Sequence, residues 1–173
     1  MSRGSKVVDA KSDLGVDSVA SGVHHIGVSV ASRDDALAFW ESFLGWKATW
    51  RTRLDRPYLG EIIGIPGVEI DGAFIDLPGG VILELLEYQT ADRRANPSAT
   101  ANPGNVHIRL AVEDADAASR RAVDCGAAPV RREGPVEVDD GPNRGARVAY
   151  LRIHDGVTLE VFQRPPAARA EPA

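Results

Sequence analysis

The sequence predicts an α+β protein with two tandem βαβββ modules, whose sheets together form a cleft with a metal site. Three observations support this prediction. Short strand-like runs alternate with single amphipathic helices, and the order of these elements occurs twice along the chain. In four of the predicted strands, a His or Glu also lies on the face opposite the aliphatic side chains.

The first module is predicted over residues 21–89 and begins with a strand over 22–30. A helix follows in "SRDDALAFWESFLG", where Ser32 suits the N-cap and Gly45 suits the C-terminal stop. Its apolar face repeats at helical spacing through Ala36, Phe39, Trp40 and Phe43. Three further strands are expected near 46–54, 68–77 and 80–88. Gly and Pro interrupt "RPYLGEIIGIPG", which has no readable periodicity.

The second module is predicted over residues 105–163, after a polar linker over 90–104. Its strand over 105–112 and helix over 114–125 precede three more strands, near 128–137, 145–152 and 156–163. Residues 1–20 lack periodicity and residues 164–173 are rich in Pro and Ala, so both are expected to be flexible tails.

The two modules are related by an internal duplication. "HIGVSV" and "HIRLAV" agree at their first, second and last positions, which places His107 82 positions after His25. "GGVILELLEYQ" and "DGVTLEVFQRP" also correspond, which places Glu160 76 positions after Glu84. A four-stranded sheet with one helix buries both faces poorly, so the two copies are expected to pack together.

Composition excludes several classes of protein. The 173 residues carry a formal net charge of −5, so no general basic field attracts nucleic acid or an anionic membrane. No apolar run approaches the roughly 20 residues of a membrane-spanning helix. Cys125 is the single cysteine, which excludes an internal disulfide and a thiolate metal cluster. No apolar block typical of a secretory signal occurs near the start, so a cytoplasmic protein is expected.

Strand alternation places His25, Glu84, His107 and Glu160 on the faces opposite the aliphatic side chains. We expect the aliphatic faces to meet the helices and the other faces to form the floor of a shared cleft. Two carboxylates and two imidazoles in an enclosed space are costly without a partner. One divalent cation would compensate them, and these ligands suit Zn, Ni, Co, Mn or Fe(II).

Two further histidines are expected to be structural. His24 shares the aliphatic face of its strand and is expected to pack in the core or at an edge. His154 follows a strand in "IHDG" and is expected on a surface turn.

The chain resembles the vicinal oxygen chelate superfamily over residues 22–163. "HHIGVSV…ALAFWESFLGW" and "VILELLE" are similar to the first half of methylmalonyl-CoA epimerase and glyoxalase I types. "NVHIRLAV" and "YLRIHDGVTLEVFQ" are similar to the second half. Superfamily members catalyse different reactions on one fold, so the resemblance leaves the substrate open.

The resemblance implies metal ligation by His25, Glu84, His107 and Glu160, with Glu160 also acting as a base. Epimerases of the family use a further glutamate just before the third strand, and Glu69 falls near that place without aligning with it. The resemblance also implies a homodimer, and leaves open whether the modules pair within one chain or across two.

The leading hypothesis is a metal-dependent isomerase or lyase acting on a small carbonyl or acyl-thioester substrate. Glu160 would abstract a proton next to the carbonyl, giving a metal-bound enediolate, and Glu84 would return the proton. Arg109 and Phe162 are candidate substrate contacts on the cleft side, together with Glu69.

Two alternatives remain open. An Fe(II) extradiol-type dioxygenase or a thiol transferase would need only three protein ligands. A binding protein of the bleomycin-resistance type would hold a small molecule in the same cleft without catalysis.

Overall fold

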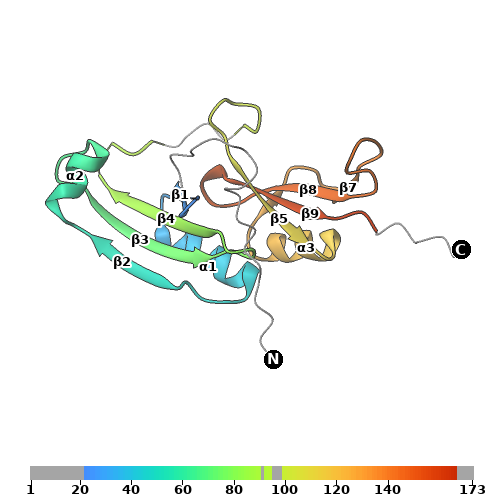
Figure 1. The fold of residues 1–173 in the computed structure, drawn as a ribbon, viewed down its shortest axis with the longest axis horizontal. Coiled ribbons are helices and arrows are strands. Elements are labelled where there is room, and N and C mark those ends of the chain that lie inside the picture. The colour runs from blue at the N-terminus through green and yellow to red at the C-terminus, as the bar shows by residue number, and fades with distance from the viewer. Residues whose placement is uncertain (1–21, 91, 95–98, 167–173) are drawn as a thin grey trace, which may run out of the picture.

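The computed structural model describes residues 22–90, 92–94 and 99–166 (Figure 1). The expected N-terminal tail, 1–20, lies outside this part of the chain, as do residues 167–173 of the expected C-terminal tail. None of the helices in the described ranges combines the length and the apolar character needed to cross a membrane.

The first module contains the predicted βαβββ order with one added helix. Its elements are β1 (Ile26–Ser29), α1 (Arg33–Leu44), β2 (Trp50–Leu54), α2 (Pro57–Ile63), β3 (Glu69–Asp76) and β4 (Ile82–Gln89). The strands lie in the order β1-β4-β3-β2, with β1 parallel to β4 and the other neighbours antiparallel. The added helix α2 occupies the segment without readable periodicity, starting at Pro57 and ending before Gly64 in the left-handed conformation.

The second module repeats this topology. Its elements are β5 (His107–Val112), α3 (Ala115–Asp124), β6 (Ala128–Pro129), β7 (Val136–Glu137), β8 (Arg147–Arg152), the 3₁₀ turn η1 (His154–Gly156) and β9 (Thr158–Gln163). The strands lie in the order β5-β9-β8-β6, and β7 also pairs with β8. The parallel pair β5–β9 corresponds to β1–β4 of the first module.

One predicted strand is wrong. Residues 128–137 form the two-residue strands β6 and β7 with an irregular segment between them. Gly134 has φ +87°, outside the strand region, and Pro135 lacks the N–H that a strand ladder requires. The apolar pattern predicts one continuous strand here, but the backbone turns at Gly134 and divides it into two short strands.

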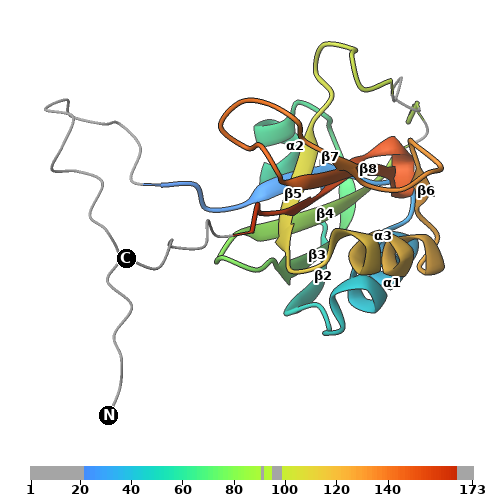
Figure 2. The same ribbon diagram turned by 90° about the vertical axis from the view of Figure 1, so that its right-hand side faces the viewer.

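The two modules share one core, in which the helices meet the aliphatic faces of both sheets. The central strands contribute Leu83, Leu85, Leu159 and Val161, each completely buried. Figure 2 shows α1 and α3 side by side below the strands, and the Arg121 guanidinium donates to the Ser42 carbonyl at 2.7 Å. The prediction that the aliphatic faces meet the helices is confirmed for these strands.

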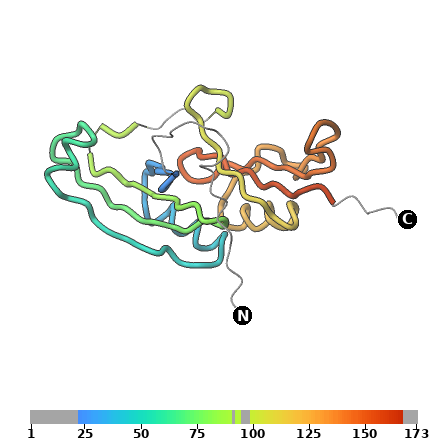
Figure 3. The backbone as a smooth tube through the Cα atoms, viewed as in Figure 1, coloured from blue at the N-terminus to red at the C-terminus, as the bar shows by residue number. Residues whose placement is uncertain are grey.

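A hydrogen bond between Trp40 and His154 also joins the modules. The Trp40 Nε1–H on α1 donates to Nε2 of His154 in η1 at 2.9 Å, and the His154 side chain is only 9% exposed. The expectation of a surface histidine is thus wrong, because α1 of the other module covers the turn. The backbone traced in Figure 3 brings these distant segments together at the centre of the molecule.

Acidification is expected to weaken this junction. Burial lowers the pKa of His154 below its ordinary value of 6.5, while nearby Asp155 opposes that shift. The His154 imidazole is therefore protonated more readily in the unfolded chain than in the folded one. Its contribution to the free energy of unfolding is complete above pH 6.5 and is lost as the pH falls towards the lowered pKa. Gln at position 154 keeps an acceptor near Nε2 without titrating.

Urea unfolding of wild type and His154→Gln between about pH 5 and 8 tests this expectation. Below pH 6.5 the stability of wild type should fall more steeply, by up to about 1.4 kcal/mol per pH unit. Parallel pH profiles for the two proteins would contradict the assignment.

Candidate functional site

The first candidate pair is formed by His25 and Glu84 on the outer face of the first sheet. His25 directly precedes β1, and β1 runs parallel to β4 with Gly27 opposite Glu84. This register brings Nε2 of His25 to 3.0 Å from Oε2 of Glu84. The His25 ring stacks on Phe74, with 6.0 Å between ring centroids, so an aromatic surface flanks the pair.

The second candidate pair, His107 and Glu160, lies at the equivalent place on β5 and β9. Nε2 of His107 is 3.1 Å from Oε2 of Glu160, and the Glu160 side chain is 1% exposed. Nη2 of Arg109 lies 2.6 Å from the other carboxylate oxygen, Oε1. Hydrogen bonding to Glu160 raises the pKa of Arg109 above its ordinary value. Arg109 also lies over the Phe162 ring, 4.5 Å from its centroid, so the guanidinium is held on two sides.

Glu160 Oε2 is a buried acceptor without a hydrogen-bond partner among the described residues. Nε2 of His107 lies 3.1 Å away, but the two atoms do not form a hydrogen bond. A buried carboxylate oxygen left in this state is costly unless another group binds it.

Both pairs have the donor chemistry and the spacing of neighbouring metal ligands. Two ligands that each lie about 2.1 Å from an ion, at right angles to one another, are about 3.0 Å apart. The observed N···O distances are 3.0 Å and 3.1 Å. Imidazole nitrogen and carboxylate oxygen suit Zn, Ni, Co, Mn or Fe(II). The residues therefore fit a divalent metal ion.

The chain does not bring the two pairs together into one site. Within the described ranges, no three His, Cys, Asp or Glu side chains are grouped so that they could hold a metal ion. Each pair instead lies at an outer strand of its sheet, β1 or β5, and at the strand beside it. The four-ligand site remains a prediction; the structure shows two separate His–Glu pairs.

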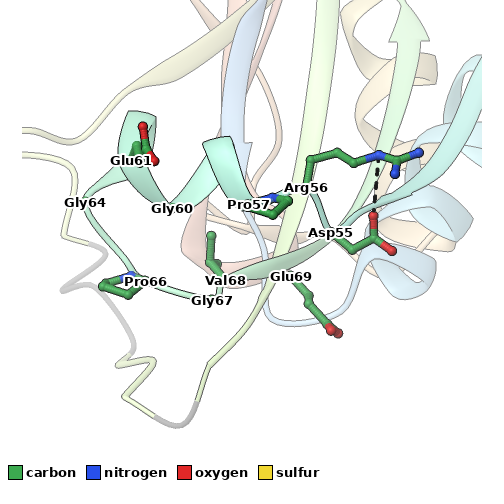
Figure 4. A pocket seen from close by; sticks show the side chains of 10 residues that line it. All are labelled: Asp55, Arg56, Pro57, Gly60, Glu61, Gly64, Pro66, Gly67, Val68 and Glu69. Atoms are coloured by element: carbon green, nitrogen blue, oxygen red, sulfur yellow. Dashed lines mark ion pairs between the residues drawn. The ribbon is translucent and has the colours of Figure 1, made fainter.

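Glu69 lies away from both pairs. It pairs in register with Gln89, so strand alternation places it on the face opposite that of Glu84. Its carboxylate forms an ion pair with Arg53. Glu69 is also one of the residues lining an open pocket of about 710 Å³ between α2 and the start of β3 (Figure 4). Its predicted contact with substrate is not tested by this position.

Two aromatic residues of the site were missed by sequence reasoning. Phe74 pairs with Glu84 in register, and Tyr150 pairs with Glu160 in the same way. Tyr150 lies under the His107 ring at a centroid distance of 5.5 Å, as Phe74 lies under His25. Phe74 and Tyr150 are 76 positions apart, as are Glu84 and Glu160. The internal duplication could therefore have identified these two aromatic residues.

The chain matches a known protein family over most of its length. Residues 24–150 match the model of the glyoxalase/bleomycin resistance protein/dioxygenase superfamily. The chain belongs to this superfamily. The resemblance to vicinal oxygen chelate proteins is thereby confirmed, as is the predicted architecture of two βαβββ modules.

Individual relatives agree with this assignment. The chain is 29% identical over 167 residues to a 2-epi-5-epi-valiolone epimerase from Actinomyces sp., covering 88% of this chain and 84% of the relative. A glyoxalase family protein from Bacillus cereus has the same fold, with a TM-score of 0.73, 22% identity and coverage of 87% of this chain and 98% of the other. A glyoxalase I variant from Zea mays gives a TM-score of 0.57 at 18% identity, over 82% of this chain and 44% of the maize chain.

Removing Arg109 should destabilise the metal-free protein. Arg109→Met leaves the buried Glu160 carboxylate without its cationic partner, which is expected to cost about 1–3 kcal/mol. Urea unfolding in the presence of a chelator measures this cost. The double variant Arg109→Met/Glu160→Gln removes the charge as well and should be closer to wild type. Equal stability of Arg109→Met and wild type would contradict the described role of the ion pair.

Proposed function

We propose that this chain is a divalent-metal-dependent isomerase of the epimerase type, acting on a small molecule with a hydrogen-bearing carbon next to a carbonyl. The observation that carries this proposal is the buried, unpartnered Oε2 of Glu160 beside the His107 ring. The relative named as an epimerase supports the choice of an isomerase among the reactions of the superfamily.

The proposed metal site is completed by two copies of the chain. His25 and Glu84 of one copy would meet His107 and Glu160 of the other, because the described part of one chain holds no group of three such ligands. The position of each pair at an outer strand supports this arrangement, since β1 and β5 each have one edge without a partner strand in the described sheets. A homodimer would then contain two equivalent sites.

The residues of the chain would divide the proton transfer between them. Glu160 would take the proton from the carbon next to the carbonyl, because Arg109 binds Oε1 and leaves Oε2 without a partner. Glu84 would return a proton to the same carbon from the other side, which inverts its configuration. A bound divalent ion would supply Lewis-acid stabilisation of the negative charge on the substrate oxygen. Phe74 and Tyr150 would provide apolar surfaces beside the reacting carbon.

Metal content tests the ligand set. Protein purified without an affinity tag should contain about one divalent ion per chain by mass spectrometry, since each chain supplies one full ligand set. Glu84→Ala and His107→Ala should each lose that ion. Retention of the ion in Glu84→Ala would favour the three-ligand dioxygenase or thiol-transferase chemistry. Wild type that binds no ion after soaking would favour a small-molecule binding protein instead.

Mixed dimers test the proposed sharing of the site. A Glu84→Ala chain paired with a His107→Ala chain would combine both defects in one site and leave the other site intact. Dimers purified with a different tag on each chain, removed before analysis, should therefore regain about half of the wild-type metal content. If the ligands came from a single chain, both sites would stay defective and no metal would return.

Proton exchange tests the reaction. Incubation of 2-epi-5-epi-valiolone in D₂O with metal-loaded enzyme is expected to place deuterium next to the carbonyl, as followed by NMR. Acyl-CoA epimers and hemithioacetals form the comparison set. Glu160→Gln should slow the exchange by about 10²–10⁴-fold, the usual contribution of a general base. Equal exchange rates for Glu160→Gln and wild type would exclude Glu160 as the base.

A further inference from the structure

We propose that His24 is a positioning residue that holds the neighbouring His25 in the tautomer required of a metal ligand. The inference rests on the proposed metal site and adds to it a residue outside the four ligands. The observation behind it is a contact of 2.8 Å between Nδ1 of His24 and Nδ1 of His25.

The exposure of His24 argues against a packing role. The side chain was expected to lie in the core or at an edge, but the structure leaves His24 exposed. Its ring instead meets His25 edge-on, with 5.1 Å between centroids and an angle of 87° between the planes. The prediction that His24 packs in the core is wrong, because the chain has not yet entered β1 at this residue.

The contact between the two Nδ1 atoms has a chemical consequence. One Nδ1 must carry a proton and donate it, while the other must present a lone pair. Nε2 of His25 faces Glu84 at 3.0 Å and must be unprotonated to bind a metal ion. With an ion bound at Nε2, a neutral His25 would carry its proton on Nδ1 and would donate to Nδ1 of His24. The hydrogen bond made by one ring nitrogen of a histidine thus determines whether the other nitrogen is protonated or free to bind a metal ion.

The rest of the surroundings fixes the His25 ring in place. The ring stacks on Phe74 at an interplanar angle of 27° and has its Nε2 edge against Glu84. His24 therefore contacts Nδ1, the remaining polar atom of the His25 ring. His25 is half-exposed, so without His24 water would compete for Nδ1 and would not impose one tautomer.

The second module provides an internal comparison. The position equivalent to His24 is Val106, which offers no acceptor to the neighbouring His107. The Val106 side chain is exposed, so it can be replaced without disturbing the core. The arrangement is therefore specific to the first half of the proposed site, and Val106 serves as a matched control.

The test compares three variants with wild type by Co²⁺ affinity, measured as competition with a chelating dye at constant pH. His24→Phe keeps a ring of similar size but has no acceptor. His24→Asn places an amide oxygen near the former Nδ1. Val106→Phe adds the same ring beside His107.

Loss of the acceptor should weaken Co²⁺ binding by about 10–100-fold in His24→Phe, the usual effect of removing a hydrogen-bond partner of a ligating histidine. His24→Asn and Val106→Phe should both bind Co²⁺ as wild type does. Unchanged affinity in His24→Phe, or equal weakening in His24→Asn, would overturn the proposal.

A metal-free measurement separates this proposal from the metal site itself. The ¹⁵N shifts of the His25 ring report which nitrogen carries the proton. Measured in a Glu84→Ala background, which removes the carboxylate acceptor beside Nε2, the Nδ1–H form of His25 should be more populated with His24 or His24→Asn than with His24→Phe. If wild type bound no Co²⁺, the metal site would fail, while this readout would still decide whether His24 sets the tautomer. Identical ring shifts with His24 and with His24→Phe in this background would overturn that role.

Discussion

Each sheet of this protein can bury only one face against its helix, and the candidate site follows from that constraint. Leu83 and Leu85 in β4, like Leu159 and Val161 in β9, are fully buried in the shared core. Strand alternation then turns the residue between each pair, Glu84 or Glu160, to the opposite face. A register shift of one residue would place a carboxylate in the core and an aliphatic chain at the site. The need to bury the aliphatic side chains therefore fixes where the carboxylates lie.

The contact between the modules determines what one chain can do alone. The helices of both modules lie in one core, and Trp40–His154 and Arg121–Ser42 hydrogen bonds join the modules there. Packing through the helices buries the inner faces of both sheets and leaves each His–Glu pair on its own outer face. Within the described residues the two pairs stay apart, so the proposed metal site depends on a second chain.

The duplication explains how much could be predicted from the sequence. Repeated His and Glu positions at a common strand parity predicted the architecture and the faces on which His25, Glu84, His107 and Glu160 lie, because period-2 alternation is local information. The prediction for His154 is wrong because its surroundings come from a distant part of the chain, and the core position predicted for His24 is wrong because the strand begins after it. Trp40 of α1 covers His154, and the chain enters β1 only after His24. The separation of the two His–Glu pairs depends on how the modules pack against each other, and the pattern of residues within a single strand does not predict that packing.

The two halves of the candidate site have diverged, and the differences suggest distinct roles for the glutamates. Glu160 is 1% exposed and held at Oε1 by Arg109, so its carboxylate has one orientation and a desolvated free oxygen. Glu84 is 13% exposed, and the residue equivalent to Arg109 in its module is Gly27, which has no side chain to hold it. A desolvated, oriented carboxylate suits proton abstraction, because little reorganisation precedes the step. A less constrained carboxylate suits the return of a proton, since it can move as the carbon changes configuration. Divergence after duplication therefore gives the proposed epimerase two carboxylates that differ in exposure and freedom, which a symmetric site would lack.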